Sequence, residues 1–293
     1  MTWNPPPTPF PIDVDQWNKD GYFIARGLWS AEEISTCREH FEMIANGPTI
    51  PGYYEPDRAS AVPLKRYPRV LHPHRFDELS RRMLLDDRIG AVLATLIGEE
   101  PIATQSMFYF KPPGGKGQAL HQDNFYLRVR PTTCVAAWTA IDRATPDNGG
   151  LYVCPGTHTL ELQCPELANP DESFTTHFVR PPAGLNPVPA ELEPGDVLFF
   201  NGSVVHGSRP NHTKDQWRRS FICHYAPASA TEISDYYQPC LHFDGREHRS
   251  FATSPEGGPC GKEFGDIWPP DDFQDAAAAG LKPVAQGSIP EAF

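Results

Sequence analysis

Residues 118–123 read Gln118-Ala119-Leu120-His121-Gln122-Asp123, and this stretch decides how the fold is interpreted. His121 and Asp123 stand two positions apart, and residues i and i+2 of a β-strand project from the same face. A strand here would aim an imidazole and a carboxylate at one point. His206, which follows the stretch 195–201 with its apolar run Val197–Phe200, can supply a third ligand. Two nitrogens and one oxygen on one side of a metal ion form the facial triad of non-haem Fe(II) oxygenases.

A second signal is needed, because a His-x-Asp sequence often arises by chance and a lone histidine is more often a core or surface residue. Arg218 follows His206 by twelve residues and shares a strand face with Ser220. A guanidinium grips a carboxylate with two parallel hydrogen bonds, so an arginine beside a hydroxyl suits a dicarboxylate. Arg219 would face the other way in a regular strand, and a bulge would exchange the two arginines.

The composition favours an acidic globular protein. The 293 residues can form one large domain or two small ones, and 17 Phe, 10 Tyr and 6 Trp supply bulky core material. A net charge of −12 argues against a nucleic-acid partner. No apolar run reaches the roughly 18 residues of a membrane span, and Met1–Pro7 lacks the features of a secretory signal. We therefore expect a cytoplasmic protein that acts on neither membranes nor nucleic acid.

The seven cysteines are odd in number and form no Cys-x-x-Cys pair. Scattered buried thiols in a reducing compartment fit this pattern better than a disulfide framework or a zinc site. The positions are Cys37, Cys134, Cys154, Cys164, Cys223, Cys240 and Cys260.

The first hundred residues are predicted to be mostly helical. Ser30 and Glu33 form a capping box that opens a helix running to about Asn46 and stopping at Gly47. A scaffolding role is expected for this part. Its other predicted elements are a helix over 14–20, a strand over 22–25, and helices over 76–85 and 88–97.

From Pro101 onward the pattern changes to short runs rich in β-branched and aromatic residues, separated by Gly, Pro and Asn turns. The predicted fold class is mainly β with helices (α+β). Its core is a double-stranded β-helix, a cupin-like jelly roll braced by the N-terminal helices. In such a barrel, inward-facing side chains converge on a ligand at the mouth. The predicted strands cover residues 103–110, 119–123, 133–141, 151–154, 187–192, 196–201 and 217–225.

We expect one domain over residues 1–293, in three parts. Residues 1–100 form the helical part, 101–226 the jelly-roll core, and 227–293 a loop-rich C-terminal part. After about Arg249 the chain is rich in Gly, Pro and Ala with weak periodicity, which predicts loops and partial disorder.

Five blocks of the sequence, taken in their order and spacing, resemble the phytanoyl-CoA dioxygenase family of Fe(II)/2-oxoglutarate oxygenases. The resemblance covers roughly residues 10–245 and is sharpest over 104–225. The blocks read HQDNFYLRVRP (121–131), AAWTAID (136–142), NGGLYVCPGTH (148–158), GDVLFFNGSVVHGS (195–208) and WRRSFICHY (217–225).

The resemblance implies a role for each matching position. The iron ligands would be His121, Asp123 and His206, and Arg218, assisted by Ser220, would pair with the distal carboxylate of 2-oxoglutarate. Residues lining that cosubstrate would be Trp138, Gln122 and Met107. The implied cofactors are Fe(II), 2-oxoglutarate and O₂, with ascorbate as a candidate reductant. Related halogenases carry a small residue in place of the carboxylate ligand, so the presence of Asp123 favours hydroxylation or a related oxidation.

The substrate is not specified by these motifs. The first hypothesis is a dioxygenase that hydroxylates or otherwise oxidises an unactivated C–H bond of a small-molecule metabolite, releasing succinate and CO₂. The second is a phytanoyl-CoA-like acyl-CoA 2-hydroxylase, although the chain ends Glu291-Ala292-Phe293 without a peroxisomal Ser-Lys-Leu signal. A non-catalytic cupin-like binding protein and a zinc hydrolase remain alternatives. The oligomeric state stays open. A basic rim for nucleotide phosphates could come from Lys65, Arg66, Arg69, Arg128 and Arg130.

Histidines outside the triad are expected to be structural. His158 is interpreted as a hydrogen bonder in a turn. His224 lies on the Arg218 face, six residues along, and could point toward the barrel interior, although a core histidine is the preferred interpretation. Arg69 is a further candidate for the same pocket.

Overall fold

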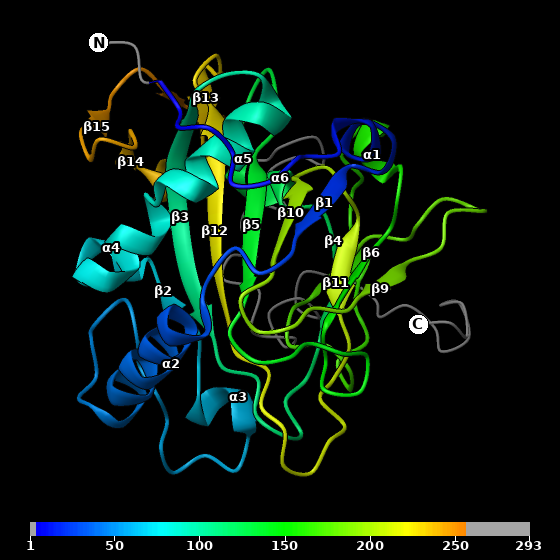
Figure 1. Ribbon diagram of the computed structural model, residues 1–293. Coiled ribbons are helices and arrows are strands. Elements are labelled where there is room, and N and C mark those ends of the chain that lie inside the picture. Colours follow the sequence, from blue (N-terminus) through cyan, green and yellow to red (C-terminus); the bar gives the residue numbers. More distant parts are fainter. Residues whose placement is uncertain (1–3, 256–293) are drawn as a thin grey trace.

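Two β-sheets face one another at the centre of the computed structural model, which describes residues 4–255 (Figure 1). Within these residues the large sheet runs in the order β1-β10-β5-β12-β3-β14-β15, with β2 paired to β3. The small sheet runs β4-β11-β6-β9. All the pairings within these two sheets are antiparallel. The predicted jelly-roll fold is confirmed.

The strands of the two sheets come from widely separated parts of the chain. The large sheet contains β1 (Tyr22–Ala25), β2 (Val70–Leu71), β3 (Pro101–Tyr109), β5 (Val135–Ala140), β10 (Val197–Asn201), β12 (Ser220–Pro227), β14 (Cys240–Leu241) and β15 (Glu247–His248). The small sheet contains β4 (Gln118–His121), β6 (Leu151–Val153), β9 (Val188–Ala190) and β11 (His206–Ser208). Two short pairs accompany them, β7 (Glu166–Leu167) with β8 (His177–Phe178) and β13 (Glu232–Ile233) with β16 (Ala252–Thr253).

The large sheet buries both of its faces, and alternate residues serve different cores. Along β10, Phe199 belongs to the core beneath the helices, whereas Leu198 and Phe200 belong to the core between the sheets. Along β5, Ala137 and Trp138 divide in the same way. Because successive side chains of a strand point to opposite faces, one apolar run can supply both cores.

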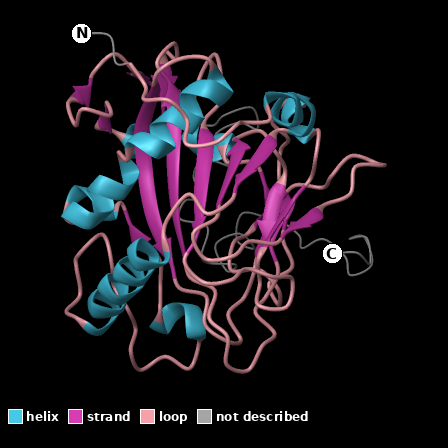
Figure 2. Ribbon diagram, in the orientation of Figure 1, coloured by secondary structure: helices cyan, strands magenta, loops and turns pink. Residues whose placement is uncertain are grey.

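Helices α2, α4 and α5 cover the outer face of the large sheet, away from the small sheet (Figures 1 and 2). Ser30 and Glu33 cap α2 reciprocally, as predicted, and α2 ends before Gly47. Phe41 of α2 stacks on Phe108 of β3, with ring centroids 3.9 Å apart. The helices are α1 (Val14–Asp20), α2 (Ala31–Asn46), α3 (Pro63–Arg66), α4 (Glu78–Leu84), α5 (Asp87–Ile97) and α6 (Asn124–Leu127), and the 3₁₀ turns are η1 (Pro73–Arg75), η2 (Thr157–Thr159) and η3 (Asp235–Tyr237).

Two predicted strands end or begin elsewhere, and both changes concern the site. The strand predicted over 119–123 ends at His121, so Asp123 lies in the turn that opens α6. The strand predicted over 217–225 begins at Ser220, although Arg218 still exchanges backbone hydrogen bonds with Lys111. Strand β11, which carries His206, was not predicted. The predicted loops and disorder after Arg249 fall mostly on residues 256–293, outside the described residues.

The cysteine prediction holds in part. Five cysteines are buried free thiols: Cys37, Cys134, Cys154, Cys223 and Cys240. Cys164 is disulfide-bonded, so the expectation of thiols alone is wrong there, and Cys260 lies outside the described residues.

Across residues 4–255, every helix is too short or too polar to cross a lipid bilayer.

Candidate metal centre

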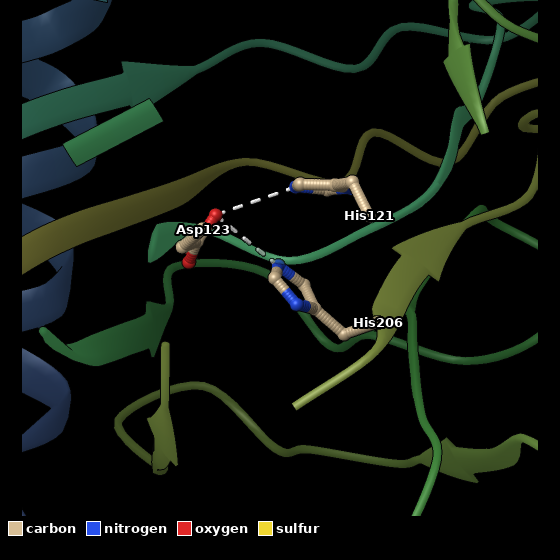
Figure 3. Close-up of side chains that lie close together, drawn as sticks. All are labelled: His121, Asp123 and His206. Carbon is tan, nitrogen blue, oxygen red and sulfur yellow. Dashed lines mark ion pairs between the residues drawn. The ribbon is translucent and has the colours of Figure 1, made fainter. Parts of the chain in front are cut away.

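Three side chains that are far apart in the sequence converge between the two sheets (Figure 3). His121 at the end of β4 and His206 at the start of β11 are direct cross-strand partners. Asp123 reaches the same point from the turn after β4. One ligand atom from each residue lies within 4.8 Å of the others, and all three residues are buried. The pairing of β4 with β11 therefore joins the two halves of the site.

Backbone carbonyls orient both imidazoles. His121 donates from Nδ1 to the carbonyl of Ala119 at 2.8 Å, and His206 donates from Nδ1 to the carbonyl of Val204 at 3.0 Å. Since Nδ1 carries the proton in each ring, Nε2 keeps its lone pair and faces Asp123. Asp123 Oδ1 lies 3.4 Å from Nε2 of His121 and 3.5 Å from Nε2 of His206. Two imidazole nitrogens and one carboxylate oxygen thus share one small space.

The protonation states of these groups suit a cation. Burial lowers the pKa of His206 to about 4 against the opposing effect of Asp123, so the ring is neutral at pH 7. Burial alone would raise the pKa of Asp123, but the neighbouring His206 and His224 outweigh it and hold the pKa well below its ordinary value. A buried carboxylate beside two imidazoles that each donate from Nδ1 to a backbone carbonyl is a donor set that suits a divalent transition metal.

A cavity of about 460 Å³ adjoins these three residues. Its wall is mostly apolar or aromatic, and Arg69, Asp123 and Arg218 bring charged groups to it. The lining includes Met107, Trp138, Leu151, Phe174, Phe200 and Ile222.

Arg218 is 2% exposed and lines this cavity. It donates from Nε to the carbonyl of Gly149 at 3.1 Å and from Nη1 to Ser220 Oγ at 3.0 Å, and its guanidinium lies 5.5 Å from the ring centre of Trp138. Burial lowers its pKa to about 10, so the group remains charged at pH 7. Arg218 has no ion-pair partner within residues 4–255 and presents a positive charge to the cavity.

Arg219 has a different environment. Its guanidinium pairs with Asp142 at 2.7 Å and also with Glu42 of α2, on the helix side of the sheet. The alternation along residues 218–220 is therefore regular, and Arg218 is the arginine that faces the cavity. Which of the two holds a cosubstrate stays a prediction.

Of the residues predicted to line the cosubstrate site, some line the cavity and one does not. Trp138 and Met107 line the cavity, and Ser220 lies behind Arg218 as its hydrogen-bond partner. Gln122 does not face the cavity, because its amide bonds the carbonyl of Ser203 and the backbone N–H of Gln163. The turn after β4 rotates Gln122 away while bringing Asp123 inward, so the prediction for Gln122 is wrong on this geometry.

Polar residues to which the sequence interpretation gave no role in the site include Gln118, whose amide lies 3.1 Å from Nε2 of His121, as well as His224 and Lys111. His224 donates from Nε2 to Asp123 Oδ2 at 3.0 Å and lines the cavity, so it points toward the barrel interior and the preferred interpretation as an ordinary core histidine was wrong. Its place on the Arg218 face of the strand was the available signal. Lys111 is buried behind Arg218, where its ammonium bonds the carbonyls of Gly149 and Arg209 and the hydroxyl of Ser208. No local motif marks Lys111.

Most of the other residues singled out in the sequence make hydrogen bonds that stabilise the fold. His158 bonds the carbonyl of Asn18, in keeping with a hydrogen bonder that ties its turn to α1. Of the suggested basic rim, Arg128 is engaged with Ser234 Oγ and the carbonyl of Pro255, whereas Arg69 lines the cavity.

Comparisons with known proteins point in one direction. A family model described as "Phytanoyl-CoA dioxygenase (PhyH)" matches residues 17–220. "Phytanoyl-CoA dioxygenase 1" of Oryza sativa subsp. japonica is 30% identical over 142 residues, which is 47% of this chain and 50% of that protein. The chain thus spans about half the length of that relative. "Methylphosphonate hydroxylase" of Gimesia maris is 28% identical over 236 residues, covering 76% of this chain and 84% of that protein.

Among solved structures, the epimerase SnoN in complex with Fe³⁺, alpha ketoglutarate and nogalamycin RO has a TM-score of 0.61 to this chain. The sequence identity is 22%, over 85% of this chain and 95% of that one. At this identity the likeness concerns the fold.

Proposed function

The chain belongs to the phytanoyl-CoA dioxygenase family of Fe(II)- and 2-oxoglutarate-dependent oxygenases, and from this premise we propose that it oxidises an unactivated C–H bond of a small-molecule metabolite. One observation carries the proposal. His121, Asp123 and His206 converge on one point of a cavity whose wall also holds the buried cation Arg218. A triad for a metal beside a site for a dicarboxylate is what this chemistry requires.

The metal ligands would be the Nε2 atoms of His121 and His206 and Oδ1 of Asp123. The fixed Nδ1 protons and the depressed pKa values of His206 and Asp123 support this assignment. When bound, iron with 2-oxoglutarate and O₂ supplies the oxidising chemistry and releases succinate and CO₂. The protein contributes ligands, orientation and a secluded cavity.

Arg218 would bind the distal carboxylate of 2-oxoglutarate. Its side chain is held on two sides by Gly149 and Ser220, so little freedom is lost when a carboxylate binds. A charged hydrogen-bonded pair also gains strength where water is excluded. Trp138 and Met107 would pack against the body of the cosubstrate, and Lys111 would hold Gly149 and Ser208 in place behind it.

The apolar wall has a second use, because it keeps water away from the reacting centre. The presence of Asp123 favours hydroxylation or a related oxidation over halogenation. In related halogenases a halide takes the position of the carboxylate ligand, and here Asp123 would fill it.

A small metabolite is the first choice of substrate. The likeness to a methylphosphonate hydroxylase supports it, and so does Arg128, whose bonds to Ser234 and Pro255 compete with a role in binding nucleotide phosphates. Acyl-CoA 2-hydroxylation is the alternative that the phytanoyl-CoA dioxygenase relatives favour. The intact triad together with Arg218 speaks against a non-catalytic binding protein, and a zinc hydrolase would leave the buried charge of Arg218 without a use.

The test is spectroscopic. Anaerobic addition of Fe(II) and 2-oxoglutarate should produce a weak metal-to-ligand charge-transfer band in the visible, and His121→Ala should abolish it. Absence of the band from the folded wild-type protein would refute the proposed cofactors. Succinate release screened across small metabolites and acyl-CoA thioesters then separates the two substrate hypotheses.

A further inference from the structure

The geometry points to His224 as a positioning residue for the metal centre: it holds the carboxylate of Asp123 so that only Oδ1 is presented to the metal. This inference rests on the proposed function, because it assigns a metal to His121, Asp123 and His206. His224 lies on β12 in the opposite sheet from the two histidine ligands.

The contact is short and fully enclosed. His224 Nε2 lies 3.0 Å from Asp123 Oδ2, and the two residues are 2% and 6% exposed. The other oxygen, Oδ1, faces Nε2 of His121 and of His206 (Figure 3). The hydrogen bond to Oδ2 holds the carboxylate with Oδ1 toward the two imidazoles, an orientation that favours ligation through one oxygen. One-oxygen ligation keeps a further coordination position free for a cosubstrate.

The need for this constraint follows from the backbone. Asp123 does not lie on strand β4 and has αR dihedral angles in the turn that opens α6. Its side chain therefore lacks the ladder that orients His121 and His206 through β4 and β11. The hydrogen bond from His224 supplies the missing orientation, as outer partners of metal ligands generally do.

The strand itself is adjusted at this residue. The register of β12 against β3 shifts between His224 and Tyr225, and the hydroxyl of Thr104 on β3 bonds the backbone carbonyl of His224. Irregularities of this kind re-aim a side chain and are common beside active sites. The backbone is thus held where the imidazole can reach Asp123.

The second ring nitrogen argues against a purely structural role. Nδ1 of His224 is buried and has no hydrogen-bond partner within residues 4–255. An unsatisfied buried polar atom destabilises a fold, and an apolar side chain would avoid the cost. The benefit of histidine here therefore lies in the bond to Asp123.

The test measures metal binding and not turnover. Co(II) is titrated into the full-length protein without cosubstrate and followed by its visible absorption, for wild type, His224→Leu, His224→Gln and His224→Asn. Leucine removes the donor, glutamine places an amide N–H where Nε2 stood, and asparagine is too short to reach. We expect His224→Leu and His224→Asn to weaken Co(II) binding about 10- to 100-fold, and His224→Gln to stay within a few-fold of wild type.

His74→Leu is the matched control. His74 is 5% exposed and bonds Ser106 Oγ, which lies on β3 outside the cavity lining. Its loss should lower the melting temperature and leave Co(II) affinity unchanged. If the leucine variant does not fold, the glutamine and asparagine variants decide the matter alone. Equal Co(II) affinity in those two would overturn the inference, whereas wild-type protein that binds no Co(II) would overturn the proposed function.

Discussion

Replacing Arg218 by methionine removes one buried positive charge together with its hydrogen bonds to Gly149 and Ser220. The methionine chain can follow the same path, and the carbonyl of Gly149 keeps its hydrogen bond from Lys111. Arg219→Met is the matched control, because that guanidinium pairs with Asp142 and Glu42 on the helix side of the sheet. We expect the first variant to lose cosubstrate affinity and the second to keep it.

The size of the loss follows from burial. Arg218 is 2% exposed and makes no ion pair with a carboxylate within residues 4–255, so a bound dicarboxylate would be attracted by it away from water. Losing one partner of such a pair costs about 2–5 kcal/mol, which is roughly 30-fold to several-thousand-fold in dissociation constant.

The assay is an anaerobic titration of 2-oxoglutarate into the Fe(II)-loaded protein, with each variant's melting temperature recorded beside it. Unchanged affinity in Arg218→Met would refute the assignment. A larger loss in Arg219→Met would mean that the other arginine holds the cosubstrate.

Two further predictions concern the scaffold. A Cβ on Gly207 would lie 2.8 Å from the carbonyl oxygen of Gln118. We therefore expect Gly207→Ala to push β11 away from β4, weaken Co(II) binding and lower the melting temperature. An unchanged Co(II) affinity would contradict this prediction. Burial lowers the pKa of His72 to about 2 and that of His74 to about 3, whereas histidine in an unfolded chain has a pKa of about 6.5. Below pH 6.5 the unfolded state therefore binds more protons than the folded state. The free energy of unfolding should fall as the pH drops from about 6.5 toward 3. In urea unfolding at several pH values, the free energy of unfolding should fall less steeply with decreasing pH in the double variant His72→Gln/His74→Gln than in the wild type. An equal dependence on pH in the two proteins would contradict the role given to these histidines.

The fold was predictable because its dominant signals are local. The capping box at Ser30 and Glu33 and the apolar run over 197–201 each depend on neighbours within a few residues. The third ligand, His206, could be proposed from its place after that run. Its strand, β11, is only three residues long, which is too short for the alternation of apolar and polar residues that predicts a strand.

The details of the site depended on distant parts of the chain. The prediction that His121 and Asp123 share a strand face was wrong, yet their side chains meet because the turn into α6 brings Asp123 back. The same turn rotates Gln122 away, which strand alternation had placed wrongly. The bond between His224 and Asp123 spans 101 positions, so the strand pattern could place His224 on the Arg218 face but could not identify Asp123 as its partner.

The two cores on either side of the large sheet divide the demands of folding and chemistry. The interior beneath the helices is filled by tightly stacked rings such as Phe41 and Phe108, where a change of volume is felt at once. The core between the two sheets contains the cavity, so its side chains are not packed against one another on every side. Leu151 and Ile222 belong both to that core and to the cavity wall, so their side chains set the volume left for a bound molecule.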